Sequence, residues 1–242
     1  MSRLFTFGCS FTKYHWMTWA DIIGRLFPEK YYNNGMTGAG NMYIFNALVH
    51  TIVQYGINEK DTVLIMWTNV TREDRFLKGR WANIGNLASQ KFYDKNFMMN
   101  YFDVRGCYER DIPAIHASRM LLDSIGCKYE MMSMVDMSNA EQYKVVDKSE
   151  DIDIKNLLAK FNSTLSLFKP SVHKVIFNYD YTSRPVEGFK GRPDFHPLPL
   201  EHLEYVEKVL PNYTIPEHVK QDVKINQQEA TIALKKYYET IR

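Results

Sequence analysis

The stretch DTVLIMW, from Asp61 to Trp67, is the clearest candidate for a buried strand in this chain of 242 residues. Five consecutive apolar side chains, from Val63 to Trp67, follow its polar start. A continuous apolar run of this kind is typical of a central strand in a parallel sheet, because helices cover both faces of such a sheet. The stretch therefore predicts an α/β protein with this strand inside the sheet.

Patterns on both sides of this stretch alternate between the periods of strands and helices. Strands are predicted over 3–7, 30–33, 128–135 and 172–178, and helices over 16–27, 41–55, 103–125, 152–168, 198–210 and 217–242. Residues 68–100 are irregular and rich in aromatic residues and asparagine, so we interpret them as an insertion. The alternation predicts a parallel sheet with helices on both faces. We expect one domain over 1–215, with the insertion at about 70–102, and a helical extension over 216–242.

The charge balance argues against several classes of partner. Thirty basic residues against 28 acidic ones leave a net charge of +2, and the longest basic run is Lys235-Lys236. We therefore expect no nucleic-acid partner and no binding to a membrane surface. No apolar run approaches the ~20 residues that span a bilayer, and the first residues lack the apolar core of a secretory signal. These features predict a cytoplasmic protein. The three widely spaced cysteines predict neither a disulfide framework nor a zinc site.

Polar motifs follow the predicted strands at the points where the strands end. In a parallel sheet these points share one edge, and ligands bind there. The motifs are Ser10 in GCSFT, the glycine-rich loop NNGMTGAGN over 33–41, Asn69 in WTN, and Asp194 and His196 in DFHP. Ester hydrolysis needs a nucleophile, a general base, an orienting acid and donors for an oxyanion. These motifs offer a residue for each of those parts.

Each motif also has a plainer interpretation. Ser10 could cap a helix. The glycine-rich loop could be a simple turn. A phosphate-binding loop is a further alternative, but the sequence has neither GxxxxGK(S/T) nor GxGxxG there. Asn69 could hydrogen-bond its own loop, and Asp194 could cap the next helix with an incidental His196. A metal site is not expected, because the six-residue separation of His196 and His202 places them on different helix faces.

Taken in order, GCSFT, NNGMTGAGN, IMWTN and DFHP resemble four sequence blocks of the SGNH/GDSL hydrolase superfamily, within residues 5 to 203. The resemblance implies that Ser10 is the nucleophile and that Asp194 and His196 are its triad partners. It also implies an oxyanion hole formed by Ser10, Gly38 and Asn69, since Gly38 lies in the loop where the family has an NxGxxG pattern.

Two features depart from the family's usual blocks. Cys9 occupies the middle position of the first block, where the family usually has aspartate, and DFH is one residue shorter than the usual DxxH. Related esterases and polysaccharide O-acetyltransferases also have the DxH spacing, which keeps a triad possible. The stretches TFGCSFT and DFHPLPLEHLEYV are similar to SGNH-like proteins encoded by bacteriophages, and this similarity suggests a phage source.

We expect a three-layer α/β/α fold with a flavodoxin-like parallel sheet in the order 2-1-3-4-5. The resemblance implies a serine ester hydrolase that works through an acyl-enzyme, and we expect no cofactor and no metal. We expect the protein to be a carbohydrate O-acetylesterase. The alternatives are an O-acetyltransferase, in which a sugar hydroxyl replaces water, and a catalytically silent structural or binding module such as a virion component.

The insertion suggests which substrate the site accepts. From Arg72 to Tyr101 it holds the aromatic residues Phe76, Trp81, Phe92, Tyr93, Phe97 and Tyr101. Aromatic faces pack against the apolar faces of sugar rings, whereas a lipid site would have a more continuous aliphatic lining. We therefore expect Trp81 and Asn41 to contact a small-molecule or carbohydrate ester. The alternative is that the rings only pack the insertion onto the sheet. The sequence indicates no oligomeric state.

Overall fold

The computed structural model describes residues 2–87, 93–138 and 148–240. Its elements, in chain order, are β1 (Leu4–Gly8), α1 (Trp19–Gly24), β2 (Tyr31–Asn33), α2 (Asn41–Tyr55), β3 (Thr62–Trp67), β4 (Arg72–Leu77), β5 (Arg80–Asn86), α3 (Lys95–Tyr101), α4 (Val104–Ile125), β6 (Lys128–Ser133), α5 (Lys148–Lys160), α6 (Asn162–Leu165), α7 (Val172–Val175), the 3-10 helix η3 (Tyr181–Ser183), α8 (Pro199–Val209) and α9 (Glu217–Thr240).

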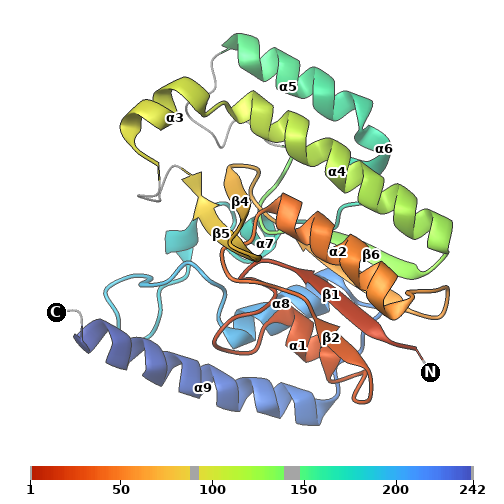
Figure 1. Ribbon diagram of the computed structural model, residues 1–242. Helices are drawn as coiled ribbons and strands as arrows, with labels where there is room; N and C mark the ends of the chain where they lie inside the picture. Colours follow the sequence, from red (N-terminus) through yellow and green to blue (C-terminus); the bar gives the residue numbers. More distant parts are fainter. Residues whose placement is uncertain (1, 88–92, 139–147, 241–242) are drawn as a thin grey trace.

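The main sheet has four parallel strands in the order β2-β1-β3-β6, and helices cover both of its faces. Figure 1 shows α2 and α4 on one side of the strands, and α1, α8 and α9 on the other. Every residue of β1 and β3 is buried, as expected for central strands of a parallel sheet between two helical layers. The predicted three-layer α/β/α fold is confirmed.

The two longest predicted helices before residue 130 begin and end close to where the sequence places them. Helix α2 ends at Gly56, which adopts the left-handed conformation with φ 57° and so closes the helix without a side-chain clash. Helix α4 begins after Asp103, whose carboxylate accepts from the N–H of Arg105 at 2.8 Å, and ends at Gly126 with φ 73°. Capping residues that are visible in the sequence therefore set these bounds.

The predicted fifth strand over 172–178 is wrong. Residues Val172–Val175 instead form the short helix α7, and Ser171 caps its first turn through its hydroxyl. Beside β6, the described residues continue the sheet only as a single parallel bridge between Met131 and Phe168. The first four strands keep the predicted order, and DFHP follows a long irregular segment rather than a strand.

The insertion is more regular than the sequence suggests. Strands β4 and β5 form an antiparallel hairpin, joined by Lys78 and Gly79, which both have positive φ as a tight two-residue hairpin turn requires. Asp74 of this hairpin accepts from the N–H groups of Gly40 and Tyr43, both at 2.8 Å. The hairpin therefore caps the start of α2. Phe92, one of the predicted aromatic residues, lies outside the described residues.

Helix α9 packs against α8 (Figure 1). A second apolar cluster forms where α9 meets the rest of the chain, and its buried members are Trp16, Val186, Leu198, Ala230 and Leu234. The division of the chain into a domain and an extension stays a prediction. Across residues 2–87, 93–138 and 148–240, no helix combines the length and the apolar character needed to cross a membrane.

Candidate active site

The loop after β1 holds Ser10 at the carboxyl edge of the sheet. Gly8 ends the strand, and a Cβ there would lie 2.0 Å from Thr12 Oγ1 and 2.9 Å from a carbonyl oxygen of β3. Only glycine fits so close an approach. The carbonyl of Cys9 accepts from the N–H of Thr12 at 2.9 Å, which closes a tight turn around Ser10. Ser10 is 2% exposed and lies in this turn, well before α1 begins at Trp19.

His196 connects Ser10 to Asp194. Its Nε2 lies 2.8 Å from Ser10 Oγ, and its Nδ1 lies 2.5 Å from Asp194 Oδ1. Ser10 and His196 are 186 positions apart in the chain, so the tertiary fold alone makes this contact. The structure thus brings together the three side chains that the sequence nominates as a triad.

The one-residue spacing of Asp194 and His196 builds a compact local turn. Oδ1 of Asp194 also accepts from the backbone N–H of His196, at 2.9 Å. One carboxylate oxygen therefore binds both the main chain and the ring of the same histidine. The departure from the longer DxxH spacing does not prevent the contact between carboxylate and imidazole.

The charge of Asp194 sets the tautomer of the ring. Burial opposes the charge, but the hydrogen bonds and charge of His196, together with a hydrogen bond from Tyr14, hold the pKa of Asp194 below its ordinary value. An ionised carboxylate only accepts hydrogen bonds, so Nδ1 of His196 carries the proton. In the neutral form of the ring, Nε2 is then the nitrogen without a proton, and it faces the hydroxyl of Ser10, which is the arrangement in which a histidine can take up a proton.

Arg192 holds the main chain of the segment that carries the histidine. Its guanidinium donates to the carbonyl of His196 at 2.6 Å and to the two carboxylate oxygens of Glu201 at 2.8 Å and 2.6 Å. Glu201 also accepts from the N–H of Leu198 at 2.8 Å. This pair is not among the site residues predicted from the sequence. Its signal is a glutamate three residues into the start of a helix, where a carboxylate commonly turns back to cap the helix.

Gly38 and Asn69 lie in the loops on either side of Ser10. The glycine-rich loop is joined to β1 by a backbone hydrogen bond of 3.0 Å to the carbonyl of Gly8. Gly38 has φ 78°, a conformation that strains any residue with a side chain. The carboxamide oxygen of Asn69 accepts from the N–H and the hydroxyl of Thr71, both at 2.9 Å, which fixes the orientation of the amide. That these residues donate to an oxyanion stays a prediction.

The expectation that Asn41 contacts substrate needs correction. Asn41 has no exposed surface. Its Nδ2 donates to the carbonyl of Thr68 at 3.1 Å and to Asp111 Oδ2 at 2.7 Å, and its Oδ1 accepts from the N–H of Thr68 at 2.8 Å. Both polar atoms are committed to the fold, so Asn41 ties the start of α2 to the end of β3 and to α4.

The aromatic residues of the insertion form two groups. Trp81 is half-buried, and its ring meets Tyr43 of α2 and Phe76 edge to face, with ring centroids 5.8 Å and 5.6 Å apart. On the way into α3, Tyr93 stacks on Phe97 at 4.2 Å. Trp81 therefore helps to pack the hairpin, and its contact with substrate stays a prediction.

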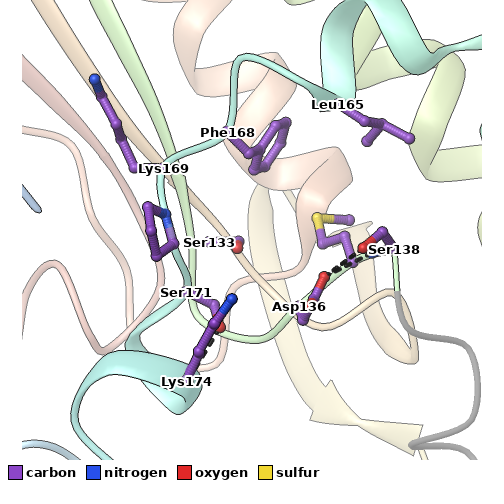
Figure 2. Close-up of a pocket in the computed structure, with 10 residues that line it drawn as sticks. Ser133, Asp136, Ser138, Leu165, Phe168, Lys169, Ser171 and Lys174 are labelled. Carbon is purple, nitrogen blue, oxygen red and sulfur yellow. Dashed lines mark hydrogen bonds between the residues drawn. The ribbon is translucent and has the colours of Figure 1, made fainter.

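Two of the hollows in the structure lie close to this edge of the sheet. One, of about 520 Å³, lies behind the triad, between Tyr14, Asp194 and α9. The other, of about 230 Å³, lies beyond the end of β6, and both polar and apolar side chains line it (Figure 2). At its rim the hydroxyl of Ser138 donates to Asp136 at 2.7 Å. Ser10 lines neither hollow. In the described part of the chain, no group of three or more His, Cys, Asp or Glu residues is placed to hold a metal ion.

Comparisons with known proteins give similarity in structure only. The sequence matches no protein-family model and no curated protein. Among solved structures, the psychrotrophic esterase EstA from Pseudoalteromonas sp. is 10% identical, with a TM-score of 0.49 over 87% of this chain and 97% of that one. A catalytic mutant of an acetylxylan esterase from Geobacillus stearothermophilus is 12% identical, with a TM-score of 0.47 over 89% and 94%. A member of the lipolytic G-D-S-L family from Veillonella parvula is 10% identical, with a TM-score of 0.46 over 86% and 97%. Because these identities and TM-scores are low, we infer the chemistry of the site from its own geometry and not from these structures.

Proposed function

We propose that this chain is a serine ester hydrolase of the SGNH type, with Ser10 as its nucleophile. The observation that supports this function is the hydrogen-bonded line from Ser10 through His196 to Asp194. The neighbouring thiol of Cys9 is a poor competitor, because its sulfur lies 4.0 Å from Met134 Sδ and accepts from the N–H of Phe11 at 3.5 Å. The hydroxyl faces the base, whereas the thiol packs into the core.

In the proposed reaction, Ser10 Oγ attacks the carbonyl carbon of the ester while its proton moves to His196 Nε2. Asp194 stabilises the resulting imidazolium without taking the proton. The N–H groups of Ser10 and Gly38 and the amide of Asn69 would stabilise the oxyanion. The carbon–oxygen bond to the alcohol then breaks, and His196 returns the proton to the leaving oxygen. Water next attacks the acyl-enzyme, with His196 again as base, to release the acid and restore the hydroxyl of Ser10.

We further propose that the acyl group is acetyl and that the alcohol is a carbohydrate. Support comes from the aromatic residues that the insertion places near the glycine-rich loop, because Gly38 lies against Asn83 of β5, on the same hairpin as Trp81. Phe76 is 62% exposed and offers a free aromatic face on that hairpin. Aromatic side chains with one face open suit the apolar faces of sugars. The phage source and the cytoplasmic location stay predictions.

The test is hydrolysis of 4-nitrophenyl acetate by purified wild-type protein and by variants that remain folded. Ser10→Ala and His196→Ala should each lower kcat by about 10³-fold or more, and the double variant should be little worse, because triad residues act as a unit. Ser124→Ala, which removes an exposed hydroxyl at the end of α4, is the matched control and should keep full activity. Full activity in Ser10→Ala would contradict the assignment. Acetyl transfer to a sugar without hydrolysis would favour the transferase, and no turnover of any ester would favour a silent module.

A further inference from the structure

Tyr14 touches both of the side chains that serve Ser10. Its hydroxyl donates to Asp194 Oδ2 at 2.9 Å. Its ring stacks on the ring of His196, with centroids 4.0 Å apart and planes within 16° of parallel. A single residue therefore contacts the carboxylate through a polar atom and the imidazole through an aromatic face. The family blocks in the sequence do not include this position.

The two oxygens of Asp194 have different partners. Oδ1 binds the backbone and ring nitrogens of His196, and Oδ2 accepts from Tyr14. Hydrogen bonds on both oxygens fix the rotation of the carboxylate, and with it the direction in which Oδ1 faces the ring. Burial, followed by the nearby charge of Asp194, raises the pKa of Tyr14 well above its ordinary value. Tyr14 therefore stays a hydrogen-bond donor throughout the pH range in which an esterase works.

The position of Tyr14 is itself fixed by its neighbours. Its ring meets Trp16 edge to face with centroids 4.5 Å apart, and Trp16 Nε1 donates to the carbonyl of Pro197 at 2.8 Å. Tyr238 of α9 donates to the carbonyl of Pro193 on the other side of the Asp194 turn. The loop after β1, the DFHP segment and α9 therefore hold one another in register around the tyrosine.

We propose that Tyr14 is a positioning residue of the triad, a proposal that rests on the proposed esterase function. Its hydroxyl fixes Asp194, and its ring holds the plane of the His196 imidazole so that Nε2 faces Ser10. A misplacement of about 1 Å in a catalytic group can lower the rate roughly 10²-fold. A residue that holds both Asp194 and His196 in place therefore affects the rate even though it does not touch the substrate.

Other ionisable groups surround the turn, and the test changes none of them. Glu229, Tyr237 and Tyr238 of α9 line the hollow that Tyr14 and Asp194 share, and so does His15, whose ring centroid lies 4.8 Å from that of Tyr14. Buried His202 of α8 lies on the other side, where burial and then the charges of His196 and Arg192 lower the pKa of His202 to about 3, so that it is neutral. Removal of the Tyr14 hydroxyl therefore changes one donor among fixed neighbours.

The test uses Tyr14→Phe, which keeps the ring and removes the hydroxyl, and Tyr14→Leu, which removes both. With 4-nitrophenyl acetate, kcat should fall about 10-fold in Tyr14→Phe and about 10²-fold in Tyr14→Leu, with KM little changed. The matched control is Tyr129→Phe, because Tyr129 also donates to an aspartate, Asp123 at 2.6 Å, but near the amino end of β6. It should leave the rate unchanged.

A second readout separates positioning from packing and needs no turnover. The Nδ1–H proton of His196, which faces Asp194, is followed by NMR, with His196→Ala used to identify its signal among the seven histidines. Without the tyrosine hydroxyl, Asp194 can rotate away from the ring, so this proton should exchange with solvent faster in Tyr14→Phe than in the wild-type protein, and at the wild-type rate in Tyr129→Phe. An unchanged exchange rate in Tyr14→Phe would overturn the proposal, as would an unchanged kcat. If the wild-type protein hydrolyses no ester, the proposed function fails, and the NMR measurement still decides the role of Tyr14.

Discussion

The ion pair between Arg192 and Glu201 should contribute more to the free energy of unfolding than the exposed ion pairs of α8, the helix that carries Glu201. The two side chains are 1% and 11% exposed, and two hydrogen bonds of 2.8 Å and 2.6 Å join them. Glu201→Gln keeps the shape of the side chain but leaves the guanidinium buried without its counter-charge. Breaking a buried pair in this way costs about 3–5 kcal/mol. We expect the lower end, about 3 kcal/mol, because glutamine keeps one acceptor oxygen.

The assay is thermal unfolding at neutral pH, followed by tryptophan fluorescence. A domain of this size is typically stable by about 5–15 kcal/mol, so the variant should remain folded in water. Its melting temperature should fall by about 6–12 °C, at roughly 2–4 °C for each kcal/mol. Glu204→Gln is the matched control on α8, because Glu204 pairs with Arg184 where the side chains are 29% and 34% exposed. Such a pair is worth about 0–1 kcal/mol. Equal losses in the two variants would refute the reasoning.

Three further results are expected. Asn69→Ala should lower kcat by roughly 10²–10³-fold with little change in KM, because an oxyanion donor acts mainly in the transition state; a rise in KM alone would make it a binding residue. Acetyl esters should be cleaved far better than esters of about eight carbons or more, and Trp81→Ala should raise KM for an acetylated oligosaccharide more than for nitrophenyl acetate; equal effects on both would exclude the sugar contact. Burial opposes the charge of Asp61, but hydrogen bonds from Arg3 and the main chain hold the pKa of Asp61 below its ordinary value. The pair therefore stabilises the fold above the unfolded pKa of ~3.9 and loses this contribution as the pH falls through the lower folded value, so the destabilisation caused by Asp61→Asn, measured by thermal unfolding, should be largest at neutral pH and shrink as the pH falls below ~3.9.

The parts of the fold that follow from local chemistry could be predicted from the sequence. The apolar run that ends at Trp67 indicates a central strand, and Gly56 and Gly126 mark the ends of two helices. The segment over 172–178 misleads, because VHKVIFN has apolar residues at a spacing that a strand and a short buried helix share. The hydroxyl of Ser171 caps this segment as a helix, but a single capping residue before a helix of only four residues is a weak signal in a sequence.

The candidate site, like the fold, could be predicted from the sequence only in part. Ser10, Asp194 and His196 could be nominated because their residue types and their places after secondary structure suit one reaction. Asn41 was wrongly expected at the substrate, because a sequence does not show that Thr68 and Asp111 use both of its polar atoms. Tyr14 was missed for the opposite reason. Its contacts lie 180 and 182 positions away along the chain, and only the tertiary structure brings them together.

The proposed function requires that the hydroxyl of Ser10 is an activated nucleophile. The most direct measurement is labelling of the folded wild-type protein with a fluorophosphonate, followed by peptide mass spectrometry to locate the adduct. We predict one phosphonyl group on Ser10, with labelling lost in Ser10→Ala and slowed by about 10³-fold or more in His196→Ala, which lacks the base. No adduct on Ser10 in the folded wild-type protein, or an adduct on the adjacent Cys9 instead, would contradict it.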